Sequence, residues 1–169
     1  MVKAEMLDAL RELGSLCPAE TEVVVIGGGA AILRGWLARA TVDIDVAAAQ
    51  PALASFRRGI AEVAEALGLP EGWMNDGAKA FARVLPPDFT ERLEHVCTFG
   101  GLTVKTISRR DFVLMKLFAM RAEDVEDLRT LAPTREELEF VRNELPRLAA
   151  FEPKRAHLIE LYVEQGGGL

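Results

Sequence analysis

Residues 23–46 read VVVIGGGAAILRGWLARATVDIDV, and the order of parts in this stretch decides which fold the chain adopts. Glu22–Ile26 is a short run rich in β-branched residues, typical of a strand that is buried on both faces. Three glycines then turn the chain, and residues 30–38 are predicted to form a helix. Thr41–Ala47 alternates apolar and polar side chains with a period of two, which predicts a second strand. On that strand the two aspartates point to the same side.

The glycine turn by itself resembles the phosphate-binding turn of a dinucleotide-binding domain, but the rest of the pattern does not fit. That fingerprint is G-x-G-x-x-G, and here Gly27 and Gly29 are followed by Ile32 at the third position. Its acidic residue stands alone about twenty residues downstream, whereas Asp43 and Asp45 come earlier and as a pair. The remaining chain also lacks the repeated βαβ units that such a domain requires. A dinucleotide cofactor is therefore not predicted.

The two aspartates point instead to a metal ion. Like charges on one face of a strand repel, and each raises the pKa of the other unless a cation lies between them. Hard oxygen ligands of this kind suit Mg²⁺ (or Mn²⁺) bound to substrate phosphates. Backbone amides of a glycine turn and of the helix that follows form a natural anion site, and a phosphate site beside a metal site is what nucleotidyl transfer requires. The alternative is an exposed edge strand whose solvated face carries two acids.

The rest of the chain alternates helices with one hairpin. Spacing and capping signals predict helices over residues 3–16, 51–67, 108–121, 134–145 and 154–164, a β-hairpin over 91–98 and 102–107, and a short helical or irregular piece over 73–82. This order predicts an α+β fold, α/β-like at its centre, with a small mixed sheet flanked by helices. Residues 1–169 are expected to form one domain, with a core in 20–110 and a helical C-terminal part in 108–165.

Composition limits the class of protein. With 169 residues, half of them apolar, the chain is long enough to bury a core without disulfides. The net charge of −6 argues against a general nucleic-acid coat protein, which would be basic. Cys17 and Cys97 stand in no metal-ligand spacing, and no apolar run approaches the ~18 residues of a membrane span. We therefore expect a cytoplasmic protein with no membrane partner.

The combined pattern resembles the minimal nucleotidyltransferases of the DNA polymerase beta-like superfamily. These proteins carry G-G-x-A, a glycine-containing helix and R-x-T-x-D-I-D, and this chain carries the same pattern in Gly27, Gly28, Ala30, Gly35, Arg39, Thr41, Asp43, Ile44 and Asp45. The likeness is greatest to small bacterial proteins related to the nucleotidyltransferase toxins of abortive-infection toxin–antitoxin systems. It continues in W-x-N-D-x-A-K-A-F at residues 73–81 and in KLFAMRAEDVEDL at residues 116–128.

The resemblance implies a reaction and a set of site residues. A nucleoside monophosphate would pass from an NTP to a hydroxyl of RNA, a protein or a small molecule, with release of pyrophosphate. Asp43 and Asp45 would bind Mg²⁺ (or Mn²⁺), and Lys116 and Asp124 (or Asp127) would complete the catalytic set. The nucleotide would be contacted by Gly27, Gly28, Arg39, Thr41 and Lys116. The implied partners are the NTP, a tRNA or protein acceptor, and a cognate antitoxin or toxin, while the oligomeric state is not predicted.

Two departures from the superfamily pattern leave a second function open. Many members place a third carboxylate on a later strand, but LTVKTIS at residues 102–108 offers Lys105 and no acid. Glu94 on the preceding strand is the nearest substitute. Gly28 also stands where a serine is commoner, so a hydroxyl contact is missing. The alternative function is therefore a catalytically inactive nucleotidyltransferase-fold protein that binds or regulates a partner.

Some of the implied site residues also have a purely structural interpretation. Lys116 lies in an apolar stripe and is equally compatible with a lysine at the helix surface that extends its ammonium to water. Asp124 and Asp127, with Arg121 and Arg129, are compatible with a solvated, salt-bridged helix face. Residues 73–81 either border the cleft and touch a base or an acceptor, or form a loop that packs its tryptophan on the core, which the residue types favour.

Overall fold

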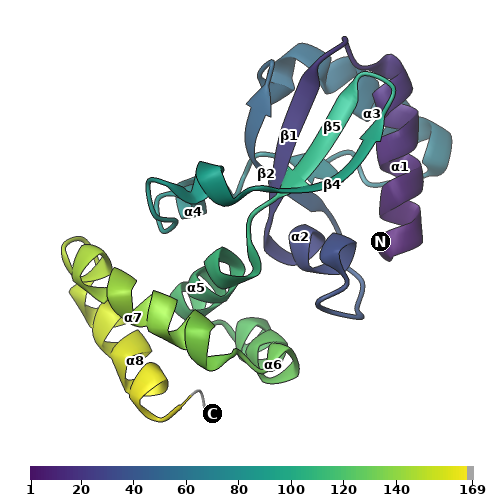
Figure 1. Cartoon of the computed structure of the whole chain (residues 1–169). Coiled ribbons are helices and arrows are strands. Elements are labelled where there is room, and N and C mark those ends of the chain that lie inside the picture. The colour runs from purple at the N-terminus through teal and green to yellow at the C-terminus, as the bar shows by residue number, and fades with distance from the viewer. Residues whose placement is uncertain (167–169) are drawn as a thin grey trace.

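The computed structural model describes residues 1–166, apart from the side chain at position 80, and contains a mixed sheet of five strands (Figure 1). The strands are β1 (Thr21–Ile26), β2 (Ile44–Gln50), β3 (Met74–Asn75), β4 (Glu94–Phe99) and β5 (Leu102–Thr106). Their order across the sheet is β3-β2-β1-β5-β4, with β1 antiparallel to β2 and parallel to β5. The predicted small mixed sheet and the predicted hairpin of β4 and β5 are confirmed.

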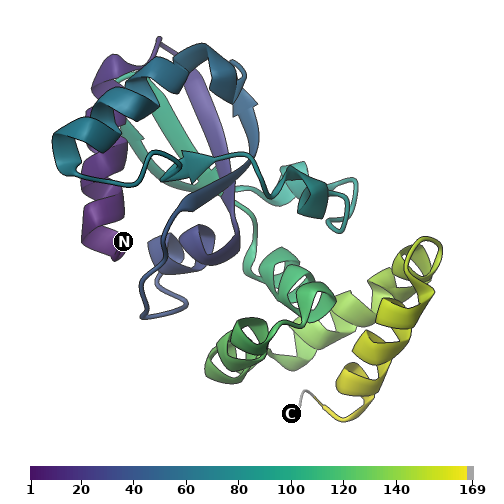
Figure 2. The same ribbon diagram turned by 180° about the vertical axis from the view of Figure 1, so that it is seen from behind.

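Helices flank this sheet and form the C-terminal part of the chain (Figure 2). In Figure 1, α1 and α3 lie beside the sheet, and α5 to α8 form a group of helices beneath it. The helices are α1 (Lys3–Leu16), α2 (Gly27–Arg34), α3 (Arg57–Leu67), α4 (Lys79–Ala82), α5 (Arg109–Ala119), α6 (Ala122–Leu131), α7 (Arg135–Ala149) and α8 (Pro153–Glu164). Single 3₁₀ turns cover Leu53–Phe56 and Phe89–Arg92. The α+β fold class predicted from the sequence is thus confirmed.

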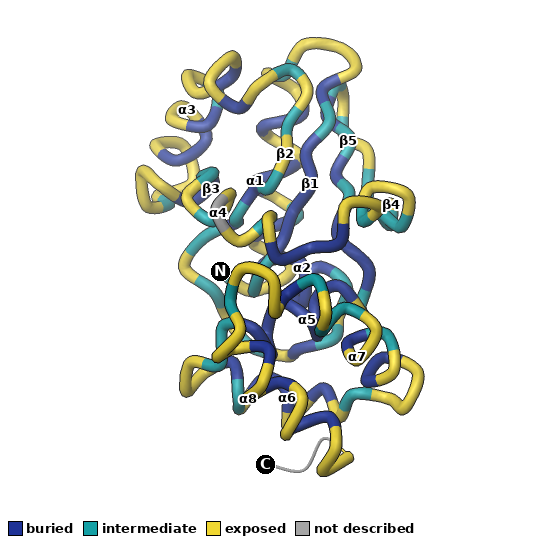
Figure 3. The backbone as a smooth tube through the Cα atoms, turned by 90° about the vertical axis from the view of Figure 1, so that its left-hand side faces the viewer, coloured by how far each residue is buried: buried dark blue, intermediate teal, exposed yellow. Residues whose placement is uncertain are grey.

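Strand β1 is buried on both faces, as its apolar run predicted (Figure 3). Val23 and Val25 belong to the apolar cluster that joins α1 and α3 to the sheet. Val24 and Ile26, which point the other way, belong to a second cluster that includes Phe112 of α5. Because β1 runs antiparallel to β2 across α2, these elements do not form the parallel βαβ unit of a dinucleotide-binding domain.

The C-terminal helices have an apolar cluster of their own. It joins α5, α7 and α8 through Leu114, Val141 and Ile159, among others. The predicted capping residues hold the starts of two of these helices: the Asp111 amide donates to the Ser108 hydroxyl, and the Glu137 amide donates to the Thr134 hydroxyl. Helix α5 also contributes to the cluster beneath β1, so it connects the sheet to the helical part.

The helix predicted to run through Arg121 ends earlier than expected. Helix α5 stops at Ala119, and Met120 adopts a left-handed backbone conformation with φ +47°. A new helix, α6, begins at Ala122. The predicted C-terminal end of this helix was therefore wrong, and Arg121 lies at the start of the second helix. The break turns α6 back toward α5, so that side chains of the two helices meet.

Two further boundaries differ from the predicted ones. The glycines do not form a separate turn before a helix over residues 30–38, because α2 begins at Gly27 and ends at Arg34, with Gly35 as its left-handed cap. Strand β2 begins at Ile44 and not at Thr41, whose backbone pairs with that of Met1 instead. Within residues 1–166 no helix combines the length and the apolarity needed to cross a bilayer.

Candidate active site

A cleft of about 790 Å³ lies between the start of α2, the beginning of β2 and the helices α5 and α6. It brings together eight residues that the resemblance assigned to the site, from segments far apart in the chain, but not Asp127, the alternative to Asp124. Those residues are Gly27, Gly28, Arg39, Thr41, Asp43, Asp45, Lys116 and Asp124. Their placement in one cleft follows from the fold, while their chemical roles stay predictions.

The glycines allow two charged side chains to approach the first turn of α2. A Cβ atom at Gly27, whose φ is +63°, would lie 3.0 Å from Asp45 Oδ2. A Cβ atom at Gly28 would lie 3.2 Å from Arg39 Nη2 and 3.5 Å from Thr41 Oγ1. The first N–H groups of a helix have no partner within the helix, so this turn presents unpaired donors and the positive end of the helix dipole. A phosphate group fits such a turn.

The aspartate pair lies next to this turn because of how β1 and β2 are paired. Their register sets Asp45 opposite Ile26, the residue just before the glycines. Burial raises the pKa of Asp45, the charge of Asp43 raises it further, and Arg121 and Lys116 offset only part of this. Among the described residues neither aspartate forms an ion pair. Strand β2 also lies inside the sheet, between β1 and β3, so the alternative of a solvated edge strand was wrong.

The aspartate pair fits a divalent cation. Its donors are hard carboxylate oxygens, and among the described residues no ion pair forms with either aspartate. A third ligand from the protein is missing, since no group of three or more His, Cys, Asp or Glu side chains in the described part of the chain is arranged to share a metal ion. Glu94, the substitute suggested by the sequence, pairs with Arg34 instead.

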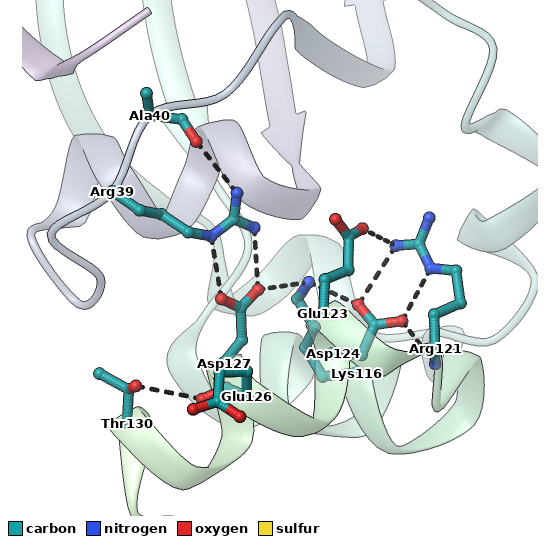
Figure 4. Close-up of polar contacts among 9 residues, drawn as sticks. All are labelled: Arg39, Ala40, Lys116, Arg121, Glu123, Asp124, Glu126, Asp127 and Thr130. Carbon is teal, nitrogen blue, oxygen red and sulfur yellow. Dashed lines mark hydrogen bonds and ion pairs between the residues drawn. The ribbon is translucent and has the colours of Figure 1, made fainter.

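Lys116 is buried and bound by two carboxylates (Figure 4). Its Nζ atom lies 2.6 Å from Asp124 Oδ1 and 2.8 Å from Asp127 Oδ2. The interpretation of Lys116 as a lysine at the helix surface was therefore wrong, because only 5% of its side chain is exposed. An ammonium group buried to this extent requires counter-charges, and α6 supplies them.

Each of these two aspartates also binds an arginine (Figure 4). Arg39 donates to Asp127 from Nε and Nη2, over 2.9 and 2.8 Å. Arg121 donates to Asp124 from Nε over 2.8 Å and from its backbone amide over 3.0 Å. We call Arg39, Lys116, Arg121, Asp124 and Asp127 the ion-pair network. It joins the loop after α2 to α5 and α6.

The ion-pair network changes the interpretation of α6. Burial opposes ionisation of Asp124, but hydrogen bonds from Arg121 and Lys116 outweigh it and hold the pKa of Asp124 below its usual value. Asp124 and Asp127 are buried, so the predicted solvated helix face was wrong for them. It holds for Arg129, which pairs with Glu126 at the exposed surface. Asp124 thus acts as a counter-charge in this structure.

Asn75 is the site residue to which the sequence gave no role of its own. Its Nδ2 atom donates to Asp43 Oδ2 over 3.0 Å, and its Oδ1 atom accepts from the Gly77 amide over 2.8 Å. The expected packing of Trp73 on the core is confirmed, since this side chain is fully buried and its indole N–H donates to the Ile60 carbonyl. The same segment also lines the cleft, through Gly77, Ala78 and Phe81. The segment therefore packs on the core and borders the cleft, while its contact with a base or an acceptor stays a prediction.

The comparison with protein families points to one class of enzyme. A family model described as "Nucleotidyltransferase of unknown function (DUF6036)" matches residues 4–140. The matched part contains the glycine turn, the aspartate pair and the whole ion-pair network. No curated protein and no solved structure matches the chain.

Proposed function

The chain belongs to this family of nucleotidyltransferases, and on that premise we propose that it transfers a nucleoside monophosphate from an NTP to a hydroxyl group, with Mg²⁺ or Mn²⁺ held by Asp43 and Asp45. One observation carries the proposal. Asp43 and Asp45 line the cleft without an ion-pair partner among the described residues, and Asp45 lies against the first turn of α2, where Gly27 leaves room for its carboxylate. When bound there, a divalent cation supplies charge neutralisation for the phosphates and orients the attacking oxygen.

The residues around the pair bind and orient the phosphates. The free amides of the first turn of α2 donate to phosphate oxygens, and Gly28 permits their close approach. Arg39 adds a positive charge beside Gly28, and Asp127 holds its guanidinium there by two hydrogen bonds. Lys116 lines the same cleft, but its ammonium group donates to Asp124 and forms an ion pair with Asp127. We therefore assign to Lys116 a positive potential at the cleft wall and the positioning of those carboxylates.

The chemical step is an in-line displacement at the α-phosphorus. The acceptor oxygen forms a bond to phosphorus, the bond to the pyrophosphate oxygen breaks, and the hydroxyl proton passes to water. Water takes the proton in this scheme because the described residues place no third carboxylate beside Asp43 and Asp45.

The missing third carboxylate also favours a second candidate function. A protein with the same cleft and no effective base would bind an NTP with its cation and would regulate a partner without turnover. The two functions share the phosphate site and the aspartate pair. They differ in one measurable property, which is the transfer of label to an acceptor.

The acceptor class follows from the resemblance to abortive-infection toxins and not from the cleft. We propose a tRNA or a protein as acceptor and a cognate antitoxin as regulatory partner, with a small-molecule hydroxyl as the third acceptor class. Each can be supplied separately in one assay.

The test is an assay with each NTP labelled at the α-phosphate. The protein is incubated with Mg²⁺ or Mn²⁺ and with total tRNA, lysate protein or a mixture of small polyols, and label in the acceptor and released pyrophosphate are both measured. The variant Asp43→Asn, Asp45→Asn serves as the negative control. Asp88→Asn serves as the matched control, because Asp88 is an exposed aspartate paired with Arg92 away from the aspartate pair.

The proposal requires transfer by the wild type and by Asp88→Asn, and none by the double variant. NTP binding without label transfer, lost in the double variant, would establish the regulatory function instead. Absence of both binding and transfer with all NTPs and both metals would refute the two functions together.

A further inference from the structure

One aromatic side chain at the cleft has no structural partner. Phe81 of α4 is 38% exposed, and among the described residues it belongs to no apolar cluster and to no aromatic pair. It nevertheless lines the cleft. Phe112, the other phenylalanine in the lining, is fully buried and packs against Trp36. A phenylalanine that stays more than a third exposed forgoes part of the stabilisation that full burial would give. Packing in the core therefore does not explain the position of Phe81.

The cleft that Phe81 lines also holds the first turn of α2 and the aspartate pair. Thr41 and Arg39 lie beside Gly28, and Asp45 lies beside Gly27. Asp43 lies between Thr41 and Asp45 in the chain. Its carboxylate accepts a hydrogen bond from Asn75, in the segment that carries Phe81.

Asn75 fixes the position of that segment relative to the aspartate pair. Its amide group donates to Asp43 at one end and accepts from the Gly77 backbone at the other, over 3.0 and 2.8 Å. The Phe81 amide in turn donates to the Ala78 carbonyl over 2.8 Å, which closes the turn that begins α4. Two hydrogen bonds of one side chain thus connect the aspartate pair to the loop that presents Phe81.

An NTP carries its phosphates at one end and its base at the other. Its β- and γ-phosphates belong at the amides of α2 and at Arg39, and its α-phosphate belongs at the cation of the aspartate pair. The ribose and the base extend from the α-phosphate, away from the other two phosphates. We propose that the nucleobase stacks on Phe81, which makes Phe81 a nucleotide-binding residue; this inference rests on the proposed function.

The chemistry of the contact sets its selectivity. Every base has a π-face, so stacking on a phenyl ring binds all four bases, and Phe81 offers no hydrogen bond to tell them apart. We expect purine nucleotides to bind more tightly than pyrimidine nucleotides because their ring surface is larger.

The experiment measures binding of two probes by calorimetry, without any acceptor. The probes are ATP and inorganic tripolyphosphate, each with Mg²⁺, and the second probe lacks a base. The proteins are wild type, Phe81→Ala, Phe81→Trp and Phe151→Ala. Phe151 is the matched control, since it is a phenylalanine of 40% exposure on the turn between α7 and α8 that does not line the cleft.

We expect Phe81→Ala to weaken ATP binding roughly 5- to 150-fold and to leave tripolyphosphate binding unchanged. Phe81→Trp should bind ATP at least as well as wild type, and Phe151→Ala should bind both probes normally. Unchanged ATP binding by Phe81→Ala would overturn the inference, and so would an equal loss for both probes. If wild type binds neither probe, the proposed function itself fails.

Discussion

Two pairs of aspartates in this molecule have opposite environments. Asp43 and Asp45 at the start of β2 have no cationic partner among the described residues, and the pKa of Asp45 is raised by its burial and by its neighbour's charge. Asp124 and Asp127 on α6 are more deeply buried, yet Arg39, Lys116 and Arg121 surround them. Burial alone therefore does not determine the environment of a carboxylate pair, because the more deeply buried pair is the one with cationic partners.

The largest effect is expected on transfer activity, from removing the charges of Asp43 and Asp45. Asp43→Asn, Asp45→Asn should reduce transfer by about 100-fold or more, because the cation that neutralises the phosphates loses its ligands. The free energy of unfolding should not fall, since the substitution removes a repulsion. Thermal melting with and without Mn²⁺ checks this: the cation should raise the melting temperature of the wild type alone. A strongly destabilised double variant would contradict the comparison.

The next effect is on stability, from the ion-pair network. Lys116→Met should lower the free energy of unfolding by about 3–5 kcal/mol, because it leaves two buried carboxylates short of a cation. Lys105→Met is the matched control: this lysine also forms one close ion pair, 2.6 Å from Glu22, but its side chain is a third exposed. It should cost under about 1 kcal/mol. Urea denaturation measures the free energy of unfolding of both variants. Equal losses would show that the burial of Lys116 does not increase its contribution to stability.

A smaller effect is expected from replacing glycines that have a positive φ, and it distinguishes backbone strain from a role in nucleotide binding. Gly27 and Gly68 have φ values of +63° and +64°, but only at Gly27 would a Cβ atom meet another group, Asp45 Oδ2. Both Gly27→Ala and Gly68→Ala should therefore cost about 1–2 kcal/mol of stability. Only Gly27→Ala should also weaken NTP binding and transfer, by about tenfold or more. Calorimetry and the transfer assay test this, and normal activity of Gly27→Ala would remove the first turn of α2 from the site.

The smallest effect concerns acid stability. Because hydrogen bonds from Arg121 and Lys116 hold the pKa of Asp124 below its unfolded value of about 3.9, its ionised form stabilises the fold. That contribution is complete above the unfolded pKa and is lost as the pH falls through the lower, folded one. Asp124→Asn should therefore flatten the decline of the free energy of unfolding between pH 5 and the lowest accessible pH. An unchanged slope in urea titrations would contradict the role of Asp124 as a counter-charge.

The sequence predicted those features that depend on neighbouring residues. Period-two alternation predicted the strand that carries Asp45, although β2 begins at Ile44 and Asp43 precedes it. The caps at Ser108 and Thr134 were recognisable because a cap and its partner lie three residues apart. The partners of Lys116 were not predictable, since they depend on the left-handed turn at Met120, a residue type that gives no signal for such a turn.

Long-range pairing was equally out of reach. Arg39 meets Asp127 across 88 positions of the chain, and Asn75 meets Asp43 across 32. Such contacts arise from how the sheet and the C-terminal helices are placed, and no local pattern encodes that placement. The family resemblance named the residues of the cleft, but it did not reveal that Lys116 and Asp124 bind each other.

The register between β1 and β2 has a consequence for engineering. Because Ile26 faces Asp45, one continuous segment from β1 through α2 to β2 carries both the glycines at the start of α2 and the carboxylate pair. That segment could be transplanted into another mixed sheet as a strand–helix–strand cassette, provided that the recipient keeps the same antiparallel alignment. The ion-pair network would not be transferred with this segment, because Arg39 is its only member inside the cassette. The recipient protein would therefore need to supply other buried cations and acids around the transplanted glycines and aspartates.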